Sequence, residues 1–267
     1  MPKIGWINWN GTRSDSLGIV VSGSGTFNAA EMDVTVYEIP GRSGDLIVSN
    51  NRFRNVQVIY PAFVPNAFET RAQPIRNWLR STDGYARLED NYDTDHYRLG
   101  RPVGMLEFSP VGHNDAANFQ IAFDCKPQRF LKNATYRLER NHIITNPTPF
   151  PAYPLFGVYT PHEGDYIEMN LRKGTGPSAE RSLYRWTFLA TMQDKHVAID
   201  CETMNVYEEN GTENYNNAIE VTQYVDGAFV PSDWPAIPPG TDAFFNWVLD
   251  EFPEFNQLVV NARWWEL

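Results

Sequence analysis

Alternation of apolar and polar positions dominates this chain and predicts many short β-strands. Across residues 120–126, Ile121, Phe123 and Cys125 share one face of an extended chain, and polar side chains occupy the other. We predict further strands over Met32–Ile39, Asp45–Val48, Val56–Tyr60, Tyr85–Leu88, Val103–Phe108, Tyr166–Met169, Leu183–Ala190, Val197–Glu202 and Leu258–Trp265. Turn residues separate these segments, a pattern typical of antiparallel sandwiches or barrels. Cys125 and Cys201 are expected to be small core residues.

One segment has a helical period instead. Its apolar side chains fall on one stripe of a helix, at Phe68, Ala72, Ile75, Trp78 and Leu79. Asn66 is a candidate N-cap, with Glu69 completing a box-like start. Pro74 leaves two interpretations: a helix that kinks there, or a shorter helix that begins at Pro74 and ends near Ser81. We favour the shorter helix.

The proline-rich segment Ile143–Pro154 is the best candidate for a linker between domains. Proline cannot donate to a central strand ladder, so this segment suits an extended connection. We therefore predict two domains, residues 1–145 and 146–267. The first combines strands with the helix, and the second is nearly all strand.

The charge balance argues against a protein that grips nucleic acid. The 267 residues include 22 Lys and Arg against 33 Asp and Glu, a formal net charge of −11. Proteins that bind duplexes neutralise phosphates with clustered basic side chains. We expect no sequence-specific nucleic-acid binding.

The sequence also gives no sign of secretion or of a membrane span. The N-terminus lacks the apolar run of a signal peptide. The longest nearly uncharged stretch, Ile143–Pro161, carries five prolines, which rules out a membrane helix there. We expect a soluble protein with reduced cysteines and no membrane partner.

An acidic segment, Glu89–Asp95, is the first place to look for chemistry. We favour a solvated turn whose acids pair with Arg87 or Arg98. A weak metal site is the second interpretation, although the glycine and glutamate that a calcium loop needs are missing. Catalysis fits least, because the acids are crowded into one turn. The histidines occur singly, and no nucleophile elbow or phosphate loop is present. We therefore expect no catalytic residue, no metal, no cofactor and no enzyme activity.

Two tryptophans close to the C-terminus suggest an interaction surface. Trp264 and Trp265 are adjacent, and adjacent residues of a strand point to opposite faces. Both rings therefore cannot enter the same core. We expect one of them to pack against another domain or subunit.

The order of several short motifs resembles the distal tail proteins of bacteriophages with long, non-contractile tails. The motifs cover nearly the whole chain and are Ser16–Ile19, Ile39–Leu46, Ile75–Leu79, Gly84–Asp93, Phe123–Leu131, Asn146–Thr148, Ala152–Leu155, Val197–Asp200, Pro238–Gly240 and Arg263–Trp265. Each is weak alone, and their order carries the resemblance.

The resemblance implies a mainly β protein with a structural role. An N-terminal β-sandwich with one helix and an extended hairpin would precede a C-terminal galectin-like β-sandwich. Six copies would form a ring at the tail tip of the virion, assembled in the cytoplasm of the bacterial host. The ring would join the tail tube protein to the tail-tip hub protein and, in many phages, to receptor-binding proteins. The genome would pass through its lumen, and the acidic balance favours an acidic channel.

The turn at 40–45 is a candidate contact between subunits. Gly41 and Gly44 flank Arg42 in this turn, and Asp45 follows. The turn and its flanking strands could form a hairpin that reaches a neighbouring copy. An ordinary tight turn with Arg42 paired to Asp45 is an equally good interpretation.

The residues alone leave two other classes of function possible. Exposed aromatic rings could make the chain a carbohydrate-binding β-sandwich that recognises glycans on the host cell. A glycosidase acting through Glu89–Asp95 is the least supported class.

Overall fold

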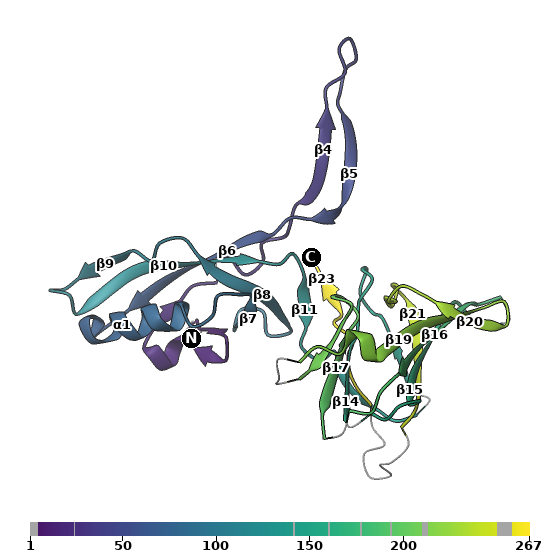
Figure 1. Cartoon of the computed structure of the whole chain (residues 1–267). Coiled ribbons are helices and arrows are strands. Elements are labelled where there is room, and N and C mark those ends of the chain that lie inside the picture. The colour runs from purple at the N-terminus through teal and green to yellow at the C-terminus, as the bar shows by residue number, and fades with distance from the viewer. Residues whose placement is uncertain are drawn as a thin grey trace. The chain divides into compact units, whose positions relative to one another are not determined.

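The computed structural model describes residues 5–23, 25–140, 142–159, 161–176, 178–192, 194–209, 213–249 and 258–267. The chain folds into two compact units. The N-terminal unit comprises Met1–Lys132 together with Leu267, and the C-terminal unit comprises Asn133–Glu266 (Figure 1). The mainly β class with a single α-helix in the described residues confirms the predicted fold class.

The N-terminal unit is built on one antiparallel sheet. Its elements in chain order are β1 (Ile7–Trp9), β2 (Thr12–Arg13), η1 (Ser14–Leu17), β3 (Val20–Val21), β4 (Met32–Tyr37), β5 (Leu46–Phe53), β6 (Val56–Val64), α1 (Phe68–Leu79), β7 (Ala86–Asp90), β8 (His96–Val103), β9 (Phe108–Val111), β10 (Ala116–Cys125) and β11 (Arg129–Leu131). The main sheet runs in the order β2-β1-β7-β8-β10-β6-β3, and β9 extends it beside β10. The predicted strand over Val103–Phe108 is wrong, because Gly104 turns the chain at a φ of 75° and Met105 is 76% exposed.

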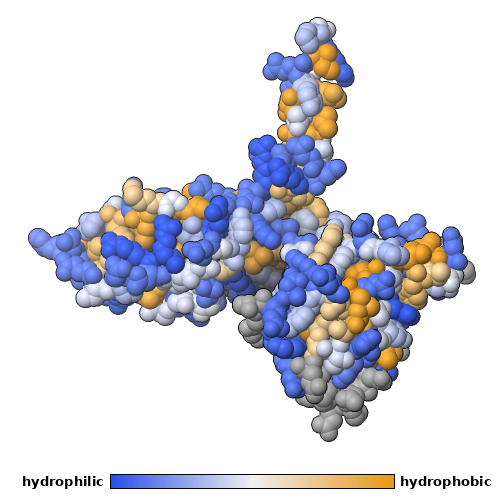
Figure 2. All heavy atoms as spheres, viewed as in Figure 1, coloured by the Kyte–Doolittle hydropathy of each residue, from blue (hydrophilic) through white to orange (hydrophobic). Residues whose placement is uncertain are grey.

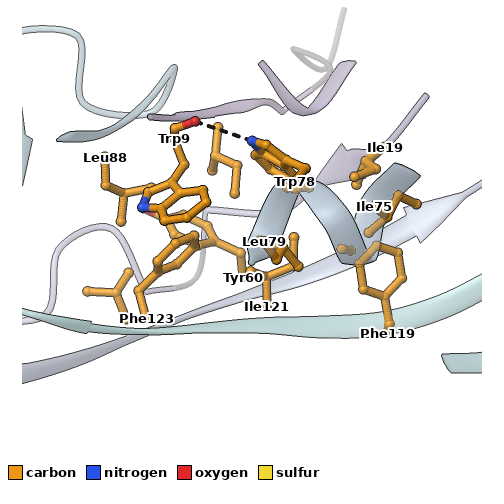
Figure 3. Packing of buried hydrophobic residues seen from close by; sticks show 14 of the residues in the cluster. Trp9, Ile19, Tyr60, Ile75, Trp78, Leu79, Leu88, Phe119, Ile121 and Phe123 are labelled. Atoms are coloured by element: carbon orange, nitrogen blue, oxygen red, sulfur yellow. Dashed lines mark hydrogen bonds between the residues drawn. The ribbon is translucent and has the colours of Figure 1, made fainter. Parts of the chain in front are cut away.

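Helix α1 packs its apolar stripe against this sheet. All five residues predicted for the stripe are buried, and Figure 3 shows Ile75, Trp78 and Leu79 among residues of the sheet. The indole N–H of Trp78 donates to the backbone carbonyl of Trp9 at 3.2 Å. The ring of Trp9 in turn contacts Phe123 at a centroid distance of 6.0 Å. The helix and the sheet thus share one aromatic core.

The helix is longer than the one we favoured from the sequence. It begins at Phe68 and contains Pro74 in its interior, so Pro74 is not its first residue. Asn66 does not cap it. The backbone N–H groups of Ala67 and Phe68 instead donate to the side chain and the backbone carbonyl of Asp115, at 2.9 and 2.8 Å. Pro74 is exposed, so water can reach the carbonyl of Thr70 that loses its helical partner.

We expect Pro74→Ala to raise the free energy of unfolding by about 2 kcal/mol. Alanine supplies the missing N–H and removes the clash of the proline ring, so it stabilises the folded helix. Alanine also restricts the unfolded chain less than proline does, but this opposing effect is smaller. Urea denaturation of the full chain measures the effect. The exposed Gln73→Ala change in the same helix is the control, with an expected change below about 0.5 kcal/mol. Equal stability of Pro74→Ala and wild type would contradict this account of the helix.

The C-terminal unit is a sandwich of two antiparallel sheets. Its elements are β12 (Thr135–Leu138), β13 (Ile143–Thr145), β14 (Leu155–Tyr159), β15 (Tyr166–Lys173), β16 (Glu180–Phe188), β17 (His196–Asp200), β18 (Asn205–Glu208), η2 (Asn216–Ala218), β19 (Ile219–Val225), β20 (Ala228–Pro231), β21 (Thr241–Val248), β22 (Leu258–Asn261) and β23 (Trp265–Glu266). One sheet has the order β12-β22-β14-β17-β18, and the other β13-β21-β15-β16-β19-β20. Phe156 of the first sheet contacts Trp186 and Phe245 of the second, at centroid distances of 5.0 and 5.7 Å. These rings lie between the sheets and form the core.

The units divide between Lys132 and Asn133, which is earlier than the predicted boundary near residue 145. The reason is strand pairing, because β12 pairs with β22 and β13 pairs with β21. The predicted linker Ile143–Pro154 is therefore part of the C-terminal unit. Asn146 is buried in it and donates to the carbonyls of Phe150 and Ile237, at 2.9 and 2.8 Å.

Candidate interaction surfaces

Strands β4 and β5 form a two-stranded hairpin separate from the main sheet of the N-terminal unit, which we call the arm (residues 32–53). Figure 1 shows the arm extending away from that sheet. At its base, the buried carboxylate of Asp33 accepts hydrogen bonds from Arg52 Nε at 2.6 Å and from Arg54 Nη2 at 3.0 Å. These hydrogen bonds outweigh the opposing effect of burial and lower the pKa of Asp33. The charges hold the two strands together where the arm starts.

The arm exposes apolar side chains on both of its faces. Val36 lies opposite Ile47, and Tyr37 lies opposite Leu46. Neighbouring residues of a strand point to opposite faces, so these two pairs cover different faces. Their exposed fractions run from 46% for Leu46 to 64% for Ile47. Figure 2 shows the hydrophobic surface that results along the arm. A pair of strands without a core is marginal in water, and such a surface marks an interaction site.

The predicted contact residues of the turn lie at the tip of the arm. Gly41 and Gly44 adopt φ angles of 80° and 86°, which side chains rarely tolerate, and so they shape the turn. Arg42 and Asp45 are both exposed, and in the described part of the chain neither has an ion-pair partner. Of the two interpretations of this turn, the one in which Arg42 pairs with Asp45 is therefore wrong. Both charges remain available to another chain.

The two C-terminal tryptophans have different environments within the C-terminal unit. Trp264 is 1% exposed, and its indole N–H donates to the hydroxyl of Tyr136 at 3.0 Å. Its ring belongs to the core and offers no surface to a neighbouring chain. Trp265 is half-buried, stacks on Phe150 at a centroid distance of 4.2 Å and donates to the carbonyl of Pro151. A contact with another chain stays a prediction for Trp265 alone.

The acidic segment is more buried than the solvated turn that we predicted. Asp90 is 6% exposed and accepts hydrogen bonds from the hydroxyls of Thr26 and Tyr60, both at 2.7 Å. Its other oxygen accepts from the backbone N–H groups of Tyr92 and Asp93. Burial and the Asp90 charge raise the pKa of Tyr60 well above its ordinary value. Asp90 therefore ties the segment to the core.

Cations pair with two other acids of this segment, Glu89 and Asp93. Glu89 pairs with Arg87, as predicted, and also with Lys132. Asp93 is partly buried, which raises its pKa, but hydrogen bonds from His96 and Arg129 lower it further than burial raises it. Arg98 instead donates to the carbonyl of Asn28 at 2.6 Å. Among the described residues, no group of three or more His, Cys, Asp or Glu side chains is placed to hold a metal ion. The arrangement is that of an ion-paired structural network.

Both cysteines are buried, free thiols in the cores of their units, as predicted. Burial raises the pKa of Cys125 to about 12 and that of Cys201 well above its ordinary value. Such thiols are poor nucleophiles at neutral pH. In the described residues, no helix is both long and apolar enough to cross a membrane.

The sequence analysis predicted a hairpin around residues 40–45 but not its two apolar faces, although the sequence contains a signal for them. Residues 34–37 and 46–48 are runs of β-branched and apolar residues with little alternation. An alternating strand buries one face, whereas a run of this kind has two apolar faces. The runs therefore indicated a strand pair that needs cover on both sides.

The solved structure of the Dit protein of phage SPP1 is similar to this chain. It is described as a paradigm of the hub adsorption apparatus in phages that infect Gram-positive bacteria, and it matches 97% of both chains with a TM-score of 0.59 and 13% identity. A structure of the phage p2 baseplate, in its activated conformation with Sr, matches 97% of this chain and 98% of that chain, with a TM-score of 0.49 and 9% identity. No family model matches the sequence, and no curated protein matches it. Over nearly its whole length, this chain has the fold of the SPP1 Dit protein and so resembles the phage distal tail proteins.

Proposed function

We propose that this protein is a structural component of a phage tail tip in which six copies close a ring. The fold that it shares with SPP1 Dit supports this role. The observation that carries the proposal is the arm, with exposed apolar side chains on both faces. A head-to-tail contact repeated around an axis closes into a ring when the rotation between copies divides a full turn. The arm of each copy packs on the next copy and so loses its contact with water.

The ring joins the tail tube protein to the tail-tip hub protein and provides sites for receptor-binding proteins. Its role is structural rather than catalytic, which agrees with thiols of raised pKa and acids paired with cations. The genome passes through the lumen. The net charge of −11 per chain favours an acidic channel, which repels phosphates over a Debye length of about 8 Å.

The charges at the tip of the arm contribute to the contact between copies. We expect the double variant Arg42→Ala, Asp45→Ala to weaken ring assembly about three- to tenfold, because two exposed ion pairs contribute modestly. The melting temperature of the chain stays unchanged, because neither side chain has an ion-pair partner within the described residues. Assembly is measured by mass photometry over a dilution series.

A charge-matched control separates this effect from a general effect of charge. Arg137→Ala with Glu139→Ala removes the same two charges from exposed positions of the C-terminal unit. We expect wild-type assembly from this control. Equal loss of assembly and melting temperature in the Arg42 and Asp45 variant would show that these residues only shape the turn.

Electron microscopy tests the location of the protein directly. Antibodies raised against the purified chain and coupled to gold are added to virions that carry it. We expect label at the distal end of the tail. Label on the capsid or along the tail shaft would contradict the proposal.

A further inference from the structure

A groove with a volume of about 360 Å³ lies on the six-stranded sheet of the C-terminal unit. It crosses β16, β15 and β21, which are neighbours in that sheet (Figure 1). Alternate residues of β15 point into it, while Ile167, Met169 and Leu171 point to the core. The side chains that line the groove include Glu168, Asn170, Arg172, Arg181, Phe244 and Asn246.

Two arginines face each other at one end of this groove. Arg172 of β15 and Arg181 of β16 are directly opposite in the strand register. Like charges in this position destabilise a sheet unless an anion lies between them. In the described part of the chain neither arginine has an ion-pair partner, and the Nε atom of Arg172 is buried without a hydrogen bond. Asp242 lies opposite Arg172 on β21, but its Oδ1 accepts a hydrogen bond from Thr145 at 2.6 Å.

The rest of the groove presents groups that hydrogen-bond to hydroxyls. Within the described residues, the amides of Asn170 and Asn246 have no hydrogen-bond partner. Each offers one acceptor and two donors. Arg185 holds Glu168 in place by donating to its Oε1 from Nε at 3.0 Å and from Nη2 at 2.5 Å, so Oε2 of Glu168 faces the groove without a hydrogen bond from Arg185. Phe244 adds an aromatic surface beside the guanidinium of Arg172, at 5.6 Å from its ring centre.

We propose that this groove binds an acidic saccharide. Its phosphate or carboxylate lies between Arg172 and Arg181, because guanidinium groups bind such anions through charge-assisted hydrogen bonds. Its hydroxyls bind to Asn170, Asn246 and Glu168, and the apolar face of the sugar ring packs on Phe244. The site goes beyond the ring proposed above and does not depend on it. It gives the tail tip an attachment point for anionic sugars on a cell surface.

Calorimetry on the full chain with paired probes tests this site. The probes are glucose 1-phosphate, galactose 1-phosphate and glucuronate, compared with glucose, galactose and inorganic phosphate. We expect at least one acidic sugar to bind about tenfold or more tightly than its neutral counterpart and than inorganic phosphate. Binding of phosphate as tight as that of every sugar phosphate would reduce the site to a general anion site. No preference for any acidic sugar would overturn the proposal.

Substitutions of residues that line the groove test whether the saccharide binds there. Arg181→Ala lowers the affinity about tenfold or more, and because Arg181 is exposed, the substitution leaves the fold intact. Asn246→Ala lowers the affinity for the sugar phosphate and leaves that for inorganic phosphate unchanged. Arg137→Ala removes the same charge from an exposed position on β12 of the other sheet and serves as the control. Equal affinity of Arg181→Ala and wild type would overturn the assignment, whatever the state of ring assembly.

Discussion

Ile47→Glu is expected to abolish ring assembly at concentrations where the wild-type protein assembles. Ile47 is 64% exposed and lies opposite Val36 on one face of the arm. Burial of an isoleucine contributes about 1.5–3 kcal/mol to a contact, and a buried glutamate adds a desolvation cost. The expected rise in the dissociation constant is therefore about 100-fold or more. Sedimentation velocity over a range of concentrations measures it.

The same variant keeps a melting temperature within about 2 °C of wild type. Substitutions of exposed residues without specific contacts change stability little. Leu189→Glu is the matched control, because Leu189 is 49% exposed and lies in the C-terminal unit. We expect it to assemble normally. Wild-type assembly of Ile47→Glu would show that the arm is not the contact.

Arg263→Ala is expected to lower the free energy of unfolding of the C-terminal unit by about 3–5 kcal/mol. Arg263 Nη1 and Nη2 bind the two oxygens of Asp200, at 2.7 and 2.9 Å. Asp200 is only 5% exposed, so the substitution leaves a buried charge without its cation. Urea denaturation at neutral pH measures the loss. The exposed pair of Arg13 and Asp15 is the control, and Arg13→Ala is expected to cost less than about 1 kcal/mol.

The pH dependence of this loss identifies its cause. Burial raises the pKa of Asp200, but hydrogen bonds from Arg263 outweigh it and hold the pKa below its ordinary value. In the wild type the pair therefore stabilises above the unfolded pKa, and this stability disappears as the pH falls through the folded pKa. Without Arg263, burial dominates and raises the folded pKa. The loss in the variant is then largest at neutral pH and shrinks as Asp200 takes up a proton.

Asp200→Asn in the Arg263→Ala background is expected to recover much of the lost stability. The amide removes the buried charge and keeps an oxygen that accepts the backbone N–H groups of Glu202 and Thr203. An unchanged stability of the double variant relative to Arg263→Ala would mean that lost packing, not the charge, causes the effect.

Local patterns in the sequence predicted the strands and the buried stripe of the helix. Alternation is read over a few residues, and it placed Phe123 and Cys125 in the core correctly. The helix start was predicted wrongly because the capping interactions come from Asp115, which is far from Ala67 in the sequence. Pro74 does not begin the helix as predicted, because a solvent-exposed carbonyl tolerates the loss of its hydrogen-bond partner.

Features that depend on strand register or distant pairing could not be predicted. Arg172 and Arg181 face each other only because of the register between β15 and β16. The buried pair of Asp200 and Arg263 joins positions 63 residues apart. The division at Lys132 likewise depends on β12 pairing with β22. The resemblance to distal tail proteins used the order of motifs, so it indicated the fold without locating these contacts.

The mass of the purified, full-length chain in solution tests the central proposal most directly. A ring of six copies of the 30.6 kDa chain has a mass of about 184 kDa, six times that of one chain. We expect mass photometry to find this species, and to find it lost in Ile47→Glu. A single species at the mass of one chain, at every concentration up to the solubility limit, would contradict the account.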